Sequence, residues 1–141
     1  MTINQISVFA ENRAGSICDM TTALAEANID IRAFNVAETK DFGVLRLIVN
    51  DAEKAKAVLA DKGFIVSITP VIGVVVPDAP GGLAKVLTAV SGINVEYIYA
   101  FVSVSGSHAY VVLRVDDNAA AEKALTDAGM DLLTDEIVQK M

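Results

Sequence analysis

Two short segments combine a glycine, an acidic or amide side chain and an aliphatic residue in the same order. They span residues 12–17 (NRAGSI) and 78–83 (DAPGGL). An apolar pattern with helical spacing follows each glycine, so each segment is expected to open a helix. The first amides of a helix are unpaired donors at the positive end of its dipole, and a glycine lets a carboxylate approach them closely. Asp78 and Asn12 can accept hydrogen bonds from an ammonium group.

An apolar wall is expected beside these segments, where it would hold the hydrophobic part of a ligand. Structural roles stay open as alternatives. Pro80 and Gly81 would then form only a tight turn, Asp78 would only cap it, and Phe34 would belong to the core. The residues predicted to form the wall are Ile17, Ile31, Phe34, Leu83 and Ile98.

Other chemically active side chains lack partners at a useful spacing. Cys18 is the single cysteine, which excludes a disulfide within the chain and a cysteine-based zinc site. His108 has no evident carboxylate or cysteine partner nearby in the sequence. The acidic pairs at 116–117 and 135–136 lack the ligand spacing of a calcium loop. The sequence therefore predicts no catalytic residue, no metal and no cofactor.

The chain repeats one pattern twice. When Gly15 is aligned with Gly81, the apolar residues of the two halves fall into step, except near the end of the first helix. We therefore predict two copies of one unit, residues 1–69 and 70–141, with no flexible linker between them and a rigid apposition of the two. Matching positions include Ile6 and Ile72, Val8 and Val74, Leu24 and Val90, Leu47 and Leu113, and Leu59 and Leu125.

The elements of each copy follow from their period. Alternation over residues 5–10 predicts a strand, and the apolar stripe over 17–27 predicts a helix. Two strands, a second helix and a final short strand come next, and the second half gives the same order. This order predicts an α+β fold of two ferredoxin-like βαββαβ units in tandem, each an antiparallel sheet with both helices on one face. Hairpin turns are expected at 40–41 and 105–107, and acidic helix caps at Asp51 and Asp117.

The predicted sheets have an apolar second face that no helix covers. A sheet face exposed to water is mostly polar, so we expect the sheets to pair with one another or with a second chain. A homodimer is the preferred interpretation. The residues expected to face away from the helices include Phe9, Val44, Ile48, Val75, Tyr110 and Val112.

Composition limits the classes of partner. The 141 residues are 53% hydrophobic, which suffices for two small cores. A net charge of −7 repels phosphate backbones and anionic lipids, so neither nucleic acid nor a membrane is expected as a partner. The apolar run at 71–76 is only as long as a strand, and the first residues lack the basic start of a signal peptide. A cytoplasmic location is expected.

The two loop segments resemble the signature of ACT domains, in which an acidic or amide residue precedes Pro-Gly, a small residue and an aliphatic one. Residues 28–31 and 93–95 are similar to the end of the first ACT helix and the start of the next strand. The resemblance covers nearly the whole chain and implies a stand-alone regulatory protein. Such a protein binds a free amino acid between paired domains, acts on a metabolic enzyme or regulator, and has no catalytic activity. The resemblance implies ligand contacts by Asn12, Gly15, Ser16 and Ile17 in one loop and by Asp78, Pro80, Gly81, Gly82 and Leu83 in the other.

The first loop departs from the ACT signature more than the second does. Two other functions also remain open for the chain. Ala14 replaces the usual proline and Arg13 adds a bulky charge, so the first loop is expected to be the weaker site. Residues 6–17 also resemble the small regulatory subunit of acetolactate synthase, although that subunit ordinarily has a single ACT domain. An acylphosphatase-like hydrolase would use Arg13 with Asn35, but the flanking residues do not resemble that family.

Overall fold

A computed structural model describes residues 1–38, 41–102 and 106–141. Its contacts divide the chain into two compact units. The N-terminal unit contains Asn4–Thr69 with Gln139–Met141, and the C-terminal unit contains Pro70–Val138 with Met1–Ile3. The few residues at each end of the chain thus belong to the opposite unit, while the domain boundary between residues 69 and 70 stays a prediction.

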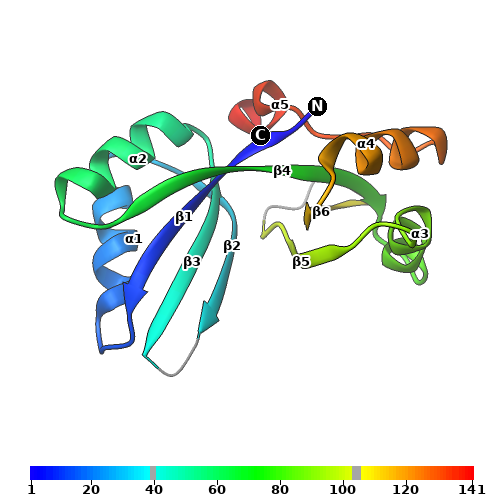
Figure 1. The fold of residues 1–141 in the computed structure, drawn as a ribbon. Helices are drawn as coiled ribbons and strands as arrows, with labels where there is room; N and C mark the ends of the chain where they lie inside the picture. Colours follow the sequence, from blue (N-terminus) through cyan, green and yellow to red (C-terminus); the bar gives the residue numbers. More distant parts are fainter. Residues whose placement is uncertain (39–40, 103–105) are drawn as a thin grey trace. The chain divides into compact units, whose positions relative to one another are not determined.

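The N-terminal unit has the predicted strand and helix order. Its hydrogen-bonded strands run in the order β2-β3-β1-β4 (Figure 1). β3 is antiparallel to both β1 and β2, and its Leu47 lies opposite Ile6 of β1 and Phe34 of β2. The elements are β1 (Ile3–Glu11), α1 (Ser16–Glu26), β2 (Ile31–Glu38), β3 (Phe42–Val49), α2 (Ala52–Asp61) and β4 (Val66–Pro77).

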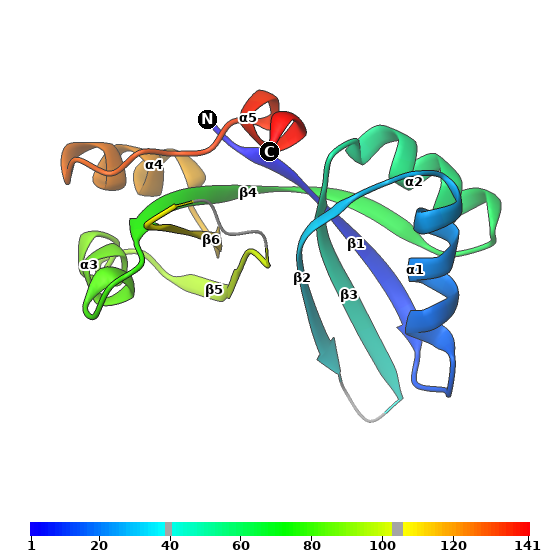
Figure 2. The ribbon, with the colours of Figure 1, turned by 180° about the vertical axis from the view of Figure 1, so that it is seen from behind.

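Both helices of this unit cover the same face of the sheet (Figures 1 and 2). Met20 of α1 and Leu59 of α2 are fully buried against Ile6 and Leu47 from the strands. These positions recur with a period of two in the strands and with helical spacing in α1 and α2, so the apolar pattern of the sequence forms one core.

The C-terminal unit repeats this arrangement around its own core. The part of β4 from Pro70 onward is the first strand of the C-terminal unit, so a continuous strand and not a linker joins the two units along the chain. Val86 of α3 and Leu125 of α4 are fully buried against Ile72 and Leu113. The prediction of two βαββαβ units of α+β class is confirmed. The strand order is β4-β6-β5, and the further elements are α3 (Gly82–Ala89), β5 (Val95–Ala100), β6 (His108–Val115), α4 (Asn118–Asp127) and α5 (Asp135–Lys140).

The end of the chain differs from the expectation. The predicted last strand is reduced to an isolated bridge between Leu132 and Val74, supported by a 2.8 Å hydrogen bond from the Leu133 amide to the Gly73 carbonyl. The short helix α5 follows, and the Thr134 hydroxyl accepts a 3.2 Å hydrogen bond from the amide of Ile137. This local bond satisfies an amide of the first turn, which favours a helix over a longer strand.

Helix caps largely follow the sequence. The carboxylates of Asp51 and Asp117 accept capping bonds of 3.1 and 3.0 Å, as predicted. Asn28 takes the left-handed conformation after α1, whereas Gly92 does not do so after α3. The hairpin turns predicted at 40–41 and 105–107 include residues outside the described part of the chain. Among the described helices, none combines the length and the apolar character needed to cross a bilayer.

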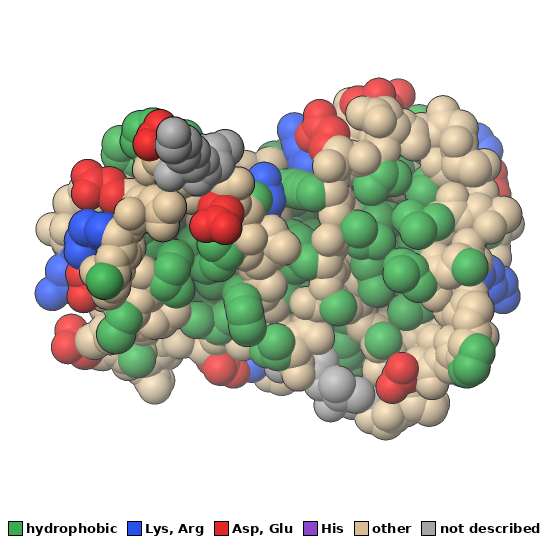
Figure 3. All heavy atoms as spheres, turned by 90° about the horizontal axis from the view of Figure 1, so that it is seen from below, with side chains coloured by type: hydrophobic (Ala, Val, Ile, Leu, Met, Phe, Trp, Pro, Cys, Tyr) green, Lys and Arg blue, Asp and Glu red, His purple; other side chains and the backbone are tan. Residues whose placement is uncertain are grey.

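Hydrophobic side chains reach the surface in both units (Figure 3). Phe9 and Phe42 are each more than half exposed. Ile48 and Val112, which were expected to face away from the helices, are buried. Of the other residues expected to face away from the helices, Val44, Val75 and Tyr110 are half-buried, so Phe9 is the exposed member of the predicted set.

Candidate functional site

A left-handed glycine opens the first helix of each unit. Gly15 precedes α1 with φ 84°, and Gly81 precedes α3 with φ 88°. Side chains with a Cβ rarely adopt this conformation, so glycine is needed at both positions to turn the strand into the helix. Neither helix has a side-chain cap at this end. Both predicted loops thus present the start of a helix without a capping side chain.

The next residue in each loop has a structural role. The amide of Gly82 donates a 3.1 Å hydrogen bond to the Ala79 carbonyl, and the amide of Ser16 donates a 3.3 Å bond to the Arg13 carbonyl. A Cβ at Gly82 would lie 2.4 Å from the Pro77 carbonyl oxygen, so the close approach of the backbone requires glycine there. Neither amide is as open to a carboxylate as the sequence suggested, and ligand contact by these residues stays a prediction.

The acceptors predicted for an ammonium group lie at the surface. Asn12 and Asp78 are both exposed, and Pro80 beside Asp78 is exposed as well. The amide of Asp78 donates a 2.8 Å hydrogen bond to the Ser107 carbonyl, which ties this loop to the start of β6.

The predicted apolar wall is not a single surface. Ile31 and Ile98 pack against the cores of their own units. Ile17 and Leu83 are 36% and 49% exposed on the helices. Phe34 is 52% exposed on the edge strand β2, so the alternative that Phe34 is a core residue is wrong.

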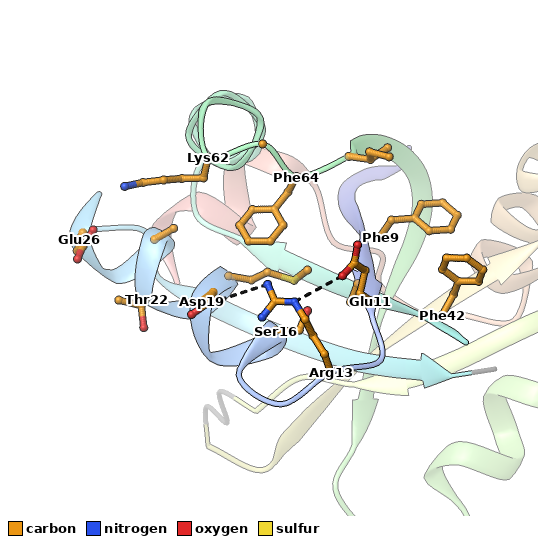
Figure 4. A pocket seen from close by; sticks show the side chains of 15 residues that line it. Phe9, Glu11, Arg13, Ser16, Asp19, Thr22, Glu26, Phe42, Lys62 and Phe64 are labelled. Carbon is orange, nitrogen blue, oxygen red and sulfur yellow. Dashed lines mark hydrogen bonds and ion pairs between the residues drawn. The ribbon is translucent and has the colours of Figure 1, made fainter. Parts of the chain in front are cut away.

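A cavity of about 640 Å³ lies beside the first loop of the N-terminal unit (Figure 4). Its walls come from the end of β1, the side of α1 and the turn between α2 and β4. Of the predicted ligand residues, only Ser16 lines this cavity. The lining residues are Phe9, Ala10, Glu11, Arg13, Ser16, Asp19, Met20, Thr22, Ala23, Glu26, Phe42, Lys62, Gly63, Phe64 and Ile65.

Charged groups of both signs surround this cavity. A nitrogen of the Arg13 guanidinium lies 3.6 Å from a Glu11 carboxylate oxygen, and another lies 3.5 Å from one of Asp19 (Figure 4). All three side chains are at least half exposed, and such pairs contribute little to stability. Lys62 and Glu26 lie at one end of the cavity and Phe9 and Phe42 at the other, with Arg13 between them (Figure 4).

Apolar groups form much of the remaining surface. Met20 is fully buried and Ala23 is 5% exposed, so these α1 side chains border the cavity but offer a ligand little accessible surface. Phe64 extends into it from the turn after α2, and Phe9 and Phe42 lie together near Glu11 (Figure 4). The cavity therefore combines accessible aromatic side chains with exposed charged groups.

A smaller cavity of about 170 Å³ lies beside the second loop, within the C-terminal unit. Gly82 is the only predicted ligand residue among the described residues that line it. Its charged or polar side chains are Lys85, His108 and Asp131, whereas the first cavity has Glu11, Arg13, Asp19, Glu26 and Lys62 among its lining residues. The lining residues are Val75, Val76, Pro77, Gly82, Lys85, His108, Gly129, Met130 and Asp131.

The groups considered for catalysis do not converge. Asn35 accepts a 3.1 Å hydrogen bond from Arg46, whereas Arg13 pairs with Glu11 and Asp19, so the two residues of the acylphosphatase alternative have different partners. Within residues 1–38, 41–102 and 106–141, no group of three His, Cys, Asp or Glu side chains is arranged to hold a metal ion.

Comparisons with known proteins cover the full chain. Residues 1–141 match the protein family described as "ACT domain pair". A crystal structure of a protein from Bacteroides thetaiotaomicron shares 38% sequence identity, covers 100% of this chain and 98% of its own, and superposes with a TM-score of 0.91. The search of curated proteins gives no match.

Two regulatory subunits of aspartate kinase share the fold at lower identity. The subunit from Thermus thermophilus is 22% identical with a TM-score of 0.64, over 89% of this chain and 91% of its own. The subunit from Thermus flavus is also 22% identical, with a TM-score of 0.56, over 89% and 92% of the two chains.

Proposed function

The chain belongs to the ACT domain pair family, and from this we propose that it is an amino-acid-binding regulatory protein, an allosteric sensor without catalytic activity of its own. The observation that carries the proposal is the position of the two cavities. Ser16 and Gly82 are aligned in the duplicated sequence, and each lines the cavity of its own unit beside a glycine-initiated helix. A repeated cavity at a repeated loop is typical of a duplicated binding module.

The predicted loop residues remain part of this proposal. The side chains of Asn12 and Asp78 would accept hydrogen bonds from a ligand ammonium group, because both are exposed beside the loops. Free amides of the first helical turns, beyond Ser16 and Gly82, would attract the ligand carboxylate. Ile17 and Leu83 on the exposed side of the helices would contact an apolar part of the ligand.

A thermal-shift screen of the twenty amino acids tests the proposal. A ligand that binds only the folded state raises the free energy of unfolding by RT ln(1 + [L]/Kd), about 2.7 kcal/mol at a hundredfold excess over Kd, and so raises the melting temperature. At least one amino acid is expected to raise the melting temperature in a concentration-dependent manner. If all twenty leave it unchanged at millimolar concentration, the sensor function is wrong.

The proposed partners are a second copy of the chain and a metabolic enzyme or regulator. The exposed apolar side chains support the homodimer, because Phe9 and Phe42 present aromatic surface to water. In the two Thermus proteins, the same fold is a regulatory subunit of aspartate kinase. Light scattering at micromolar concentration is expected to give twice the mass of one chain, and Phe9→Asp is expected to halve that mass. A monomeric wild-type protein would contradict the dimer.

A further inference from the structure

We propose that the cavity of the N-terminal unit binds the amino acid, that it selects one with a large apolar or aromatic side chain, and that the equivalent cavity of the C-terminal unit has lost this ability. The inference rests on the proposed function, which supplies the ligand class. It reverses the ranking of the two loops that the sequence suggested.

The two cavities are the same site in two copies. Every described residue that lines the smaller cavity aligns with a residue that lines the larger one. Gly82 corresponds to Ser16, and Gly129 corresponds to Gly63 in the turn after the second helix. The aligned lining residues come from segments that are distant along the chain. We therefore interpret the two cavities as copies of one duplicated site and not as unrelated surface depressions.

The copies differ in size and in charge. The first cavity has about 640 Å³, within the range of roughly 300–1,000 Å³ typical of ligand pockets, whereas the second has only about 170 Å³. Ala79 and Ala128 stand where the first unit has Arg13 and Lys62. α3 has 8 residues against 11 in α1, and therefore lacks the last turn that carries Glu26.

The entrance of the larger cavity is complementary to a zwitterion. The Arg13 contacts of 3.6 and 3.5 Å are longer than the roughly 2.7–2.9 Å of a strong charge-assisted hydrogen bond. A ligand carboxylate can therefore take the guanidinium in a bidentate pair, while Glu11 and Asp19 accept hydrogen bonds from the ligand ammonium. In the second copy, Lys85 replaces Asp19 and puts a cation where the ammonium would lie.

The wall of the larger cavity favours an apolar side chain. Phe64 is half-buried and faces the cavity, and Phe9 and Phe42 line it with more than half of their surface exposed. Burial of one large apolar side chain favours binding by about 10- to 100-fold over glycine. In the second copy His108 replaces Phe42, and Asp131 replaces Ile65, which makes that lining more polar.

Titration calorimetry of the full chain tests the ligand class, with L-phenylalanine, L-leucine and glycine as probes. Phenylalanine or leucine is expected to bind at least about 10-fold more tightly than glycine. Binding of glycine with equal or higher affinity would overturn the selection of an apolar side chain.

Four substitutions at three exposed positions locate the site. Arg13→Ala and Asp19→Ala are each expected to weaken binding of the tighter probe by about 10-fold or more, because each removes a charged hydrogen-bonding partner. Lys85→Ala is the matched control at the position equivalent to Asp19, and it is expected to stay within about twofold of the wild type. Arg13→Lys keeps the charge but loses the planar fork, so an intermediate affinity is expected. Circular dichroism melts confirm that each variant folds.

The outcomes separate the site from the function. If the wild type binds but Arg13→Ala and Asp19→Ala bind equally well, the ligand lies elsewhere, and the inference fails while the sensor function stands. A loss confined to Lys85→Ala would assign the site to the C-terminal unit and also overturn the inference. If no amino acid binds the wild type, the proposed function itself fails.

Discussion

Replacement of Gly82 by alanine is expected to destabilise the protein, although the change adds one methyl group. The new Cβ would lie 2.4 Å from the carbonyl oxygen of Pro77 and 3.5 Å from its carbonyl carbon. The oxygen belongs to the backbone at the end of β4, so it cannot rotate away as a side chain would. The backbone between β4 and α3 must therefore move.

The magnitude follows from two opposing terms. The contact must open from 2.4 Å to at least 3.0 Å, and overpacking of this kind costs about 1–3 kcal/mol. Alanine gains roughly 0.5–1 kcal/mol over glycine in a helix. Because Gly82 is the first residue of α3, the gain is at the lower end, and a net loss of about 1–2 kcal/mol is expected.

Two other glycines serve as controls in the same unit. Gly92→Ala meets no heavy atom within 4 Å and needs no positive φ, so a change between zero and a gain of about 1 kcal/mol is expected. Gly81→Ala also has open space but has φ +88°, which costs about 1–2 kcal/mol through backbone strain alone. Urea unfolding followed by circular dichroism, with the midpoint and the slope fitted, measures all three. A Gly82→Ala midpoint equal to that of Gly92→Ala would refute the steric reasoning.

Further predictions concern caps, core and charge. Asp51→Ala and Asp117→Ala each remove a capping carboxylate and are expected to lose about 1 kcal/mol in urea titrations; no loss in either would contradict the cap assignment. Leu59→Ala leaves a cavity at a fully buried core position and is expected to lower the free energy of unfolding by about 2–5 kcal/mol. A decrease of less than about 1 kcal/mol would contradict this expectation. The hydrogen bond and then the charge of Asp127 raise the pKa of Lys123, so Asp127→Asn is expected to lower that pKa in an NMR titration. Because the folded pKa of Lys123 is higher than its ordinary value, the small stabilising contribution is present at pH values below that ordinary pKa and is lost as the pH rises through the folded pKa. A stability difference between wild type and variant that is unchanged above the folded pKa would contradict this assignment.

The fold was predictable because its signals are local and repeated. Alternation in β1, the apolar stripe of α1 and the acidic caps at Asp51 and Asp117 each appear within a few residues, and the duplication gives every signal twice. The helix α5 was missed because a final strand was the expectation from the first copy, although the Thr134 hydroxyl and the acidic residues Asp135 and Glu136 mark the start of a helix. The repeat therefore helped where the copies agree and misled where they differ.

The cavity was not predictable to the same degree, because its walls are distant in sequence. Lys62 and Phe64 join Arg13 beside α1 only when the turn after α2 packs next to it. Arg13 was interpreted as a departure that weakens the first loop, whereas the structure places it at the entrance of the larger cavity. The usable signal was the cluster of Glu11, Arg13 and Asp19 around one loop, which has charges of both signs.

The two copies have kept their cores and changed the surroundings of their cavities. Leu59 and Leu125 occupy equivalent positions and are both fully buried, because a cavity in either core would destabilise its unit. The exposed positions around the cavities carry no such constraint, since most surface substitutions change stability by less than about 0.5 kcal/mol. Folding alone therefore accounts for neither the charges of Arg13 and Lys62 in one copy nor the alanines in the other. A ligand that binds only the N-terminal unit and needs the charges of Arg13 and Lys62 would account for these charges and for the alanines at the equivalent positions of the C-terminal unit.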